Sequence, residues 1–138
     1  MNIPRLLLAI VVGFVLVFGS DFLIHGIWLK PDYDATKALW RPEAEMEARF
    51  AWMFCAQFLC AGSFMVIWAL GFAGRSVGTG IVVGLILGLF EQVWAIVNFV
   101  VIPMPGELAA KWFVSGLVQA VLLGAAAALI YRPRVAAT

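Results

Sequence analysis

Charge is what this sequence has least of: only 12% of its 138 residues are Asp, Glu, Lys or Arg, about half the share usual in a soluble domain. Apolar residues make up 64% of the chain, and so little polar surface cannot cover a water-solvated globule of this size. The net charge of +1 lacks the basic excess that marks a nucleic-acid-binding surface. The composition therefore excludes a soluble domain and gives no reason to expect a nucleic-acid partner.

Residues that commonly hold metals or cofactors are also scarce. There is one histidine, His25, and there are two cysteines, Cys55 and Cys60. Five positions along a helix turn these thiols about 140° apart, so they cannot form a disulfide within that helix. The sequence contains no paired-histidine, P-loop or haem-attachment motif. We therefore expect no metal and no cofactor, assign no catalytic residue, and regard an enzyme as the least favoured class of function.

Long apolar runs are abundant instead. Four of them cover residues 6–29, 50–72, 77–102 and 108–131, and each is long enough to cross a bilayer, which takes about 20 helical residues. The sequence predicts an all-α fold in which residues 1–138 form a single domain, an integral membrane four-helix bundle surrounded by the lipid bilayer. A cleaved signal peptide ending near Gly19 is the alternative for the N-terminus. Because the first apolar run continues to Leu29, an intact first span that retains residues 1–19 is favoured.

Basic residues indicate the orientation. The two termini and the short connection after residue 72 carry Arg5, Arg75, Arg132 and Arg134 and no acid. The other two connections mix basic and acidic residues and are longer in total. Since positive charge accumulates in short cytoplasmic segments, we predict a multi-pass protein of the cell (inner) membrane with both termini in the cytoplasm.

The two halves of the chain are similar to each other. The segment EMEARFAW (45–52) aligns with ELAAKWFV (107–114) at an offset of 62, which also pairs Gln57 with Gln119. In the preceding helices an offset of 70 pairs Asp21 with Glu91. Two helices per unit predict a parallel 2+2 repeat of two similar helical hairpins. Chance similarity among apolar helices is the competing explanation.

Each predicted span contains a strongly polar side chain in its outer half. A charged group costs at least about 2.5–3.5 kcal/mol in hydrocarbon, so these side chains should face the bundle interior or water. His25 follows Asp21 by four positions, and Asn98 follows Glu91 by seven, so each pair shares a helix face. The candidate ligand- or proton-binding residues are Asp21, His25, Gln57, Glu91, Asn98 and Gln119.

A structural role is the alternative for all of these residues. Polar side chains also hold transmembrane helices together, for about 0.6 kcal/mol per hydrogen bond, and the two glutamines fit that role better than ligand binding. The stretch GTGIVVGLILG places Gly80, Gly84 and Gly88 at four-residue intervals, a helix-packing ridge that admits a close neighbour. Whether that neighbour belongs to the same chain or to another is open.

Three stretches, DFLIHGIWLKPDYDATKALWRPEAEM, MPGELAAKWF and GAAAALIYRP, together resemble a group of small four-helix bacterial inner-membrane proteins of unknown function. The resemblance covers most of the chain, and the first stretch is the most specific part of it. It implies a prokaryotic membrane protein with four spans. It implies no activity, substrate or catalytic residue.

Three hypotheses for the function follow. The leading one is binding or movement of a small solute, ion or proton at an outward-facing polar site around Asp21, His25 and Glu91. The second is a non-catalytic membrane subunit or assembly component, which packs through the glycine ridge against a larger complex or, as a homo-oligomer, against a second copy. The third is a membrane-embedded enzyme that uses Asp21 and His25 as an acid–base pair.

Overall fold

The structure, a computed structural model, describes residues 1–133 and is 84% helical, with no strand among these residues. Its first long helix is α1 (Ile3–Asp21), which continues as a π-helical segment, η1 (Phe22–Trp28). The other three are α4 (Phe50–Gly71), α5 (Val77–Val101) and α6 (Gly106–Ile130). All four are long and apolar enough to cross a membrane. The prediction of an all-α chain with four long apolar helices is therefore confirmed.

Local signals in the sequence explain where the long helices begin and turn. The Asn2 side chain accepts a hydrogen bond from the Arg5 backbone N–H and caps α1, and the Ser76 hydroxyl caps α5 by accepting from Thr79. Pro105 precedes α6, and Glu107 in its first turn complements the positive end of the helix dipole. Between α4 and α5, Gly74 adopts a φ of 81°, a left-handed conformation that favours glycine.

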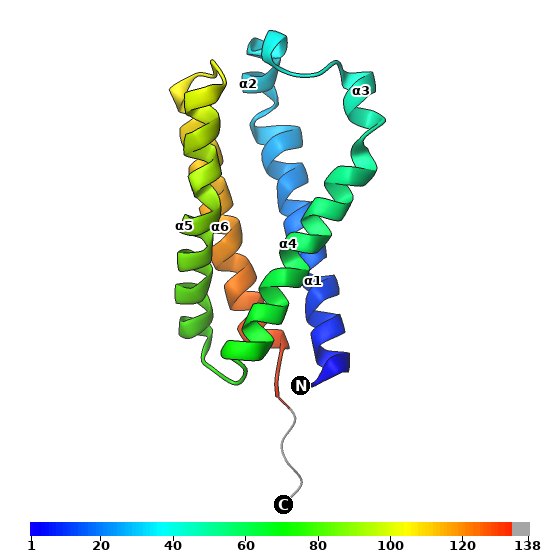
Figure 1. Cartoon of the computed structure of the whole chain (residues 1–138), viewed down its shortest axis with the longest axis vertical. Helices are drawn as coiled ribbons and strands as arrows, with labels where there is room; N and C mark the ends of the chain where they lie inside the picture. Colours follow the sequence, from blue (N-terminus) through cyan, green and yellow to red (C-terminus); the bar gives the residue numbers. More distant parts are fainter. Residues whose placement is uncertain (134–138) are drawn as a thin grey trace, which may run out of the picture.

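The long helices form two unequal pairs (Figure 1). Helices α5 and α6 lie side by side along their length, whereas α4 crosses α1 with a less extensive contact. Helix α1 also packs against α6, and this contact joins the two pairs. The repeat of two similar hairpins remains a prediction. The two aligned segments differ in structure, since residues 107–114 lie within α6 while residues 45–52 are interrupted by a turn before α4.

The two ends of the bundle differ in charge. The N-terminus and the C-terminal end of α6 lie at the same end of the bundle as the α4–α5 turn (Figure 1), and Asn2 links them by donating to the Tyr131 hydroxyl and the Arg132 carbonyl. Arg5, Arg75 and Arg132 belong to this end, while Arg134 lies outside the described residues. The opposite end carries the long connection, which contains α2 (Lys30–Ala35), the 3-10 turn η2 (Lys37–Leu39) and α3 (Glu43–Glu47). It also carries every acidic residue that lies outside the long helices, and Glu107, in the first turn of α6, lies at this end as well.

The glycine ridge has its neighbour within the chain. Gly80 faces Gly124, Gly84 faces the backbone at Ala120 and Val121, and Gly88 faces Leu117 and Ala120, all on α6. All three ridge glycines are buried. The ridge is thus covered by α6 and offers no surface to a larger complex or a second copy. The hypothesis of a membrane subunit that packs through this ridge therefore needs a different contact surface.

An apolar core fills the half of the bundle nearer the termini. Met65 and Trp68 of α4 are fully buried there against Leu123 and Ala127 of α6, and α1 and α5 contribute further aliphatic side chains. Each of these positions lies closer to the termini end than the polar residue of the same helix. The apolar core therefore lies between the polar residues and the end of the bundle that holds the N-terminus.

Candidate functional site

A change of helix type shapes the site. The segment η1 begins directly after Asp21, and the Leu29 backbone N–H donates to the Ile24 carbonyl, five residues earlier, at 2.8 Å. Single π-helical turns inside α-helices are frequent at functional sites. His25 lies within this segment, and its Nε2 is 3.9 Å from Asp21 Oδ1. The two residues therefore do share a face, but through a backbone geometry that the sequence pattern did not predict.

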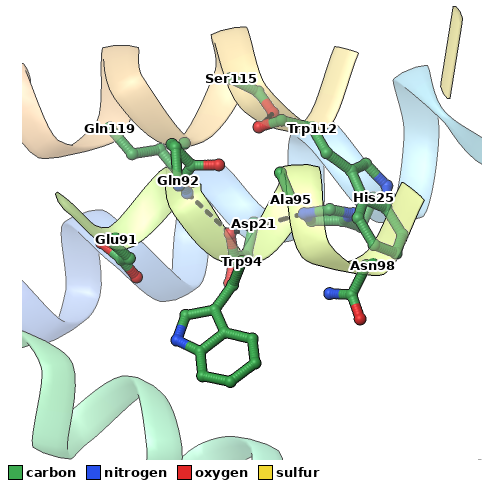
Figure 2. A pocket seen from close by; sticks show the side chains of 11 residues that line it. Asp21, His25, Glu91, Gln92, Trp94, Ala95, Asn98, Trp112, Ser115 and Gln119 are labelled. Atoms are coloured by element: carbon green, nitrogen blue, oxygen red, sulfur yellow. Dashed lines mark hydrogen bonds and ion pairs between the residues drawn. The ribbon is translucent and has the colours of Figure 1, made fainter. Parts of the chain in front are cut away.

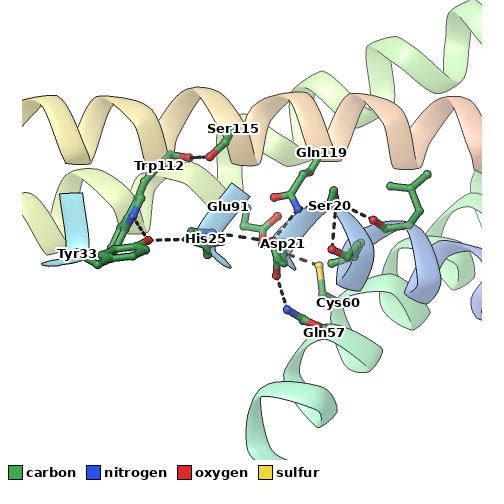
Figure 3. A network of polar contacts seen from close by, with 12 residues as sticks. Ser20, Asp21, His25, Tyr33, Gln57, Cys60, Glu91, Trp112, Ser115 and Gln119 are labelled. Carbon is green, nitrogen blue, oxygen red and sulfur yellow. Dashed lines mark hydrogen bonds and ion pairs between the residues drawn. The ribbon is translucent and has the colours of Figure 1, made fainter. Parts of the chain in front are cut away.

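Asp21 is the centre of a hydrogen-bonded network that joins three helices (Figure 3). Gln57 of α4 donates through Nε2 to Asp21 Oδ2, and Gln119 of α6 donates through Nε2 to Asp21 Oδ1 at 2.7 Å. Gln119 Nε2 also lies 2.8 Å from the Ser20 hydroxyl, which itself donates to the Leu16 carbonyl. Every donor that reaches the Asp21 carboxylate from α4 and α6 is a neutral amide. These bonds hold the helices together and bring no positive charge to the carboxylate.

The outer side of the network runs through the long connection. Tyr33 of α2 places its hydroxyl 2.5 Å from His25 Nδ1, and the Trp112 indole of α6 donates to the same hydroxyl at 2.7 Å (Figure 3). Burial raises the pKa of Tyr33 to about 12. The Trp112 hydrogen bond opposes that rise, and the charges of Asp21 and Asp32 add to it. The phenol is therefore protonated at every physiological pH.

Two further contacts fix Tyr33 in place. Lys111 of α6 binds both carboxylate oxygens of Asp32 at 3.1 Å, and it also pairs with Glu107 at 2.8 Å. The Trp40 ring packs 5.6 Å from Tyr33 and 5.9 Å from Trp112, measured between ring centroids. The connection is thus tied to α6 by an ion pair and an aromatic cluster, directly beside His25.

An open pocket of about 320 Å³ lies between η1, α5 and α6 (Figure 2). Its lining includes the carboxylates of Asp21 and Glu91 and the His25 imidazole but neither lysine nor arginine; it consists of Asp21, His25, Glu91, Gln92, Trp94, Ala95, Asn98, Trp112, Ser115, Gly116 and Gln119. Within residues 1–133, no group of three His, Cys, Asp or Glu side chains is placed to hold a metal ion. The pocket is therefore acidic and aromatic, and large enough for a small solute.

The predicted residues of α5 line this pocket without joining the network around Asp21. Glu91 is exposed at its edge, where the Cys60 thiol lies 3.9 Å from its Oε1. Asn98 is half-buried in the lining. The contacts thus join Asp21, His25, Gln57 and Gln119 directly, whereas Glu91 and Asn98 share only the pocket.

Gln92 is a pocket residue that the sequence reasoning missed. Its side chain is buried against Gly116 of α6, where a Cβ would overlap it. The signal was present in the sequence, because position 92 continues the four-residue spacing of Gly80, Gly84 and Gly88 along the same helix face. Glu91 precedes it by one position and is turned away from the α6 interface by about 100°. This rotation explains why Glu91 lies at the edge of the pocket.

The stretch GRSVG (74–78) has the spacing of a hydrolase nucleophile elbow. That motif needs a turn from a strand to a helix, but Ser76 lies between two helices and serves as the cap of α5. His25, the single histidine, belongs to the opposite end of the bundle. The serine therefore has no histidine base.

Fold and site together define a class: an all-helical chain with four helices apolar enough to span a membrane and an acid-lined pocket between three of them. No family model, curated protein or solved structure gives a significant match to this chain.

Proposed function

We propose that this chain is a multi-pass protein of the inner membrane, a four-span bundle with both termini in the cytoplasm. Its long helical stretches have 22 to 26 residues, and at 1.5 Å per residue they match a hydrocarbon core of about 30 Å. Large apolar side chains such as Val15, Phe90 and Val100 are 62%, 80% and 77% exposed, as lipid-facing side chains would be. The end that holds the N-terminus and the end of α6 carries Arg5, Arg75 and Arg132 and, within residues 1–133, no acid, which supports the orientation.

Within this arrangement we propose that the pocket binds a small cationic solute. The observation that carries the proposal is the pairing of two carboxylates, Asp21 and Glu91, in one pocket whose lining contains no lysine or arginine. A carboxylate among apolar helices attracts a cation far more strongly than the same group in water. The amide donors on Asp21 stabilise its negative charge and leave it uncancelled.

The solute would enter from the acidic end of the bundle. The pocket lies in the half of the bundle that carries the long connection, and the apolar core around Met65 and Trp68 separates it from the termini end. Binding from the outside therefore needs no large rearrangement. Transport across the membrane requires the core to open, so binding and transport are separate questions for experiment.

Thermal unfolding of the purified protein in detergent tests binding. Sodium, potassium, ammonium and methylammonium chloride are compared at equal ionic strength. A cation that binds the folded state stabilises it by about 2.7 kcal/mol at a hundred times its Kd. We expect at least one of them to stabilise the wild type, and we expect Asp21→Asn to abolish that effect and Glu91→Gln to weaken it. Glu43→Gln, which alters an exposed acid of α3 outside the pocket, is the matched control.

Flux into proteoliposomes tests transport with the same cations and with protons, over a pH series. If no cation changes the stability of the wild type and no flux exceeds that of empty liposomes, the cation-binding function is wrong. A non-catalytic membrane subunit is then the better description.

A further inference from the structure

We propose that Tyr33 is a positioning residue: it holds His25 as a neutral imidazole whose Nε2–H faces Asp21, so that the carboxylate keeps its negative charge for a cation. The inference rests on the cation-binding function proposed above. It gives the long outer connection, which supplies Tyr33, a part in the chemistry of the pocket.

The hydrogen-bond geometry determines which histidine nitrogen carries the proton. An indole N–H can only donate, so the Tyr33 oxygen accepts from Trp112. The hydroxyl has one hydrogen of its own, and His25 Nδ1, at 2.5 Å, is the acceptor in reach. If Nδ1 carried a proton instead, the Tyr33 oxygen would accept twice and its own hydrogen would have no partner in this network. The arrangement in which the Tyr33 hydroxyl both accepts from Trp112 and donates to His25 Nδ1 places the histidine proton on Nε2, 3.9 Å from Asp21 Oδ1.

The surroundings of Tyr33 keep this geometry fixed. The Tyr33 and His25 rings are nearly parallel, at 18°, with centroids 6.0 Å apart. The ion pair of Asp32 with Lys111 and the packing of Trp40 hold the Tyr33 backbone and ring against α6. Its raised pKa keeps the phenol available as a donor.

Neutrality of His25 matters because of its position. A protonated imidazole would lie 3.9 Å from Asp21 and would act as a built-in counter-ion in competition with a bound cation. The titratable groups that face the imidazole are Asp21 of α1, Tyr33 of α2 and, across the pocket, Glu91 of α5. Helices α4 and α6 contribute neutral groups to the network, Gln57, Gln119 and Trp112. The nearby Asp21 carboxylate favours imidazolium, and the Tyr33 hydrogen bond to Nδ1 opposes it because that bond exists only with the unprotonated nitrogen.

Nitrogen NMR can test this directly, because the chain contains a single histidine. In full-length protein labelled with ¹⁵N-histidine in detergent micelles, the Nδ1 and Nε2 shifts report tautomer and charge. We expect the wild type to show one tautomer, protonated at Nε2, from pH 8 to pH 5.5. We expect Tyr33→Phe, which keeps the ring, to show mixed tautomers at pH 8 and imidazolium at pH 5.5.

A matched pair of tryptophan variants controls for general loosening of the aromatic cluster. Trp112→Phe removes the donor to Tyr33, while Trp40→Phe keeps an aromatic ring beside Tyr33 and removes a donor to Thr36 that does not reach His25. We expect the first to shift the histidine spectrum toward that of Tyr33→Phe and the second to leave it unchanged. Equal effects of both variants would contradict the specific role of the Trp112–Tyr33–His25 chain.

Cation binding is then compared at pH 7.5 and pH 5.5, with methylammonium and sodium as probes. An unrestrained histidine, with a pKa near 6.5, passes from about 10% to about 90% charged over this range. At pH 5.5 the apparent cation affinity of Tyr33→Phe should therefore be roughly tenfold below that of the wild type, whose histidine stays neutral.

The two proposals can fail separately. A wild-type spectrum with the proton on Nδ1, or a Tyr33→Phe spectrum identical to wild type, overturns the positioning role even if cations bind. The expected spectra without binding of either probe support the positioning of His25 and overturn the cation-binding function.

Discussion

Gly84→Ala is the most direct test of how closely α5 and α6 approach. A Cβ added at Gly84 would overlap the Ala120 carbonyl oxygen and would lie 2.9 Å from Val121 Cα and 3.0 Å from the Ala120 carbonyl carbon. Carbon atoms in contact are normally about 3.5–4.0 Å apart. Because all of these neighbours are backbone atoms, no side chain can turn away, and the two helices must separate by roughly 0.5–1 Å.

The expected magnitude combines two opposing effects. Overfilling a packed contact costs about 1–3 kcal/mol, while replacing glycine by alanine within a helix returns up to about 1 kcal/mol. With three backbone atoms in the way, we expect Gly84→Ala to lower the free energy of unfolding by about 1–2 kcal/mol. Gly84→Leu, which adds a longer side chain at the same point, should lose more.

Gly62→Ala is the matched control, because a Cβ at Gly62 in the middle of α4 would meet nothing within 4 Å. It keeps the propensity gain and avoids the clash, so its stability should equal or exceed that of the wild type. Thermal unfolding of the purified variants in detergent, followed by circular dichroism, gives the order. If Gly84→Ala proves as stable as Gly62→Ala, the close approach of α5 and α6 along the glycine ridge is wrong.

Two shorter predictions concern the orientation of the chain and the burial of Tyr33. Single cysteines are placed at Thr36 and at Ser76 in a background without Cys55 and Cys60, and intact cells are treated with an impermeant thiol reagent. The reagent should label position 36 and not position 76, and the reverse result would invert the proposed orientation. The difference in phenolate absorbance between wild type and Tyr33→Phe should appear near pH 12. Since the unfolded phenol ionises near pH 10, the native state holds its proton longer and the stability of the fold should fall from about pH 10 upward. A Tyr33 transition near pH 10 would show that the phenol is not buried in the network.

The sequence predicts the long helices because their signals are local. Each helix is marked by its own apolar run, and the starts of α5 and α6 are marked by Ser76 and Pro105 directly before them. With η1 counted as part of the first stretch, the helix ends lie within three residues of the predicted runs. The glycine ridge predicted a close neighbour but not which one, since spacing describes only one side of a contact. Covering it with α6 requires knowing how the two helices are rotated, and that rotation also decides that Gln92 is buried and Glu91 is not.

The outer half of the site could not be predicted because its contacts are distant in sequence. Tyr33 and Trp112 are 79 positions apart, as are Asp32 and Lys111. Nothing in the polar connection around Tyr33 indicates that it folds back over α6. The π-helical segment could not be predicted for a different reason: its sequence, FLIHGIW, is as apolar as the α-helix that it continues. The sequence therefore identified Asp21 and His25 as a pair but not the residue that orients the imidazole.

The stability of Asp21→Asn can decide whether Asp21 serves only to hold helices together. Interhelical hydrogen bonds average about 0.6 kcal/mol in membranes, so the two glutamine bonds contribute about 1.2 kcal/mol. A charged group deep in a membrane costs about 2.5–3.5 kcal/mol, which is more than the two hydrogen bonds contribute. An asparagine would accept or donate to the same amides, once one glutamine amide turns over, without the cost of the charge. We therefore expect Asp21→Asn to unfold at the same or a higher temperature than the wild type when no probe cation is present. A variant that unfolds well below the wild type would mean that the carboxylate is structural, and the pocket would lose its main reason to be regarded as a cation site.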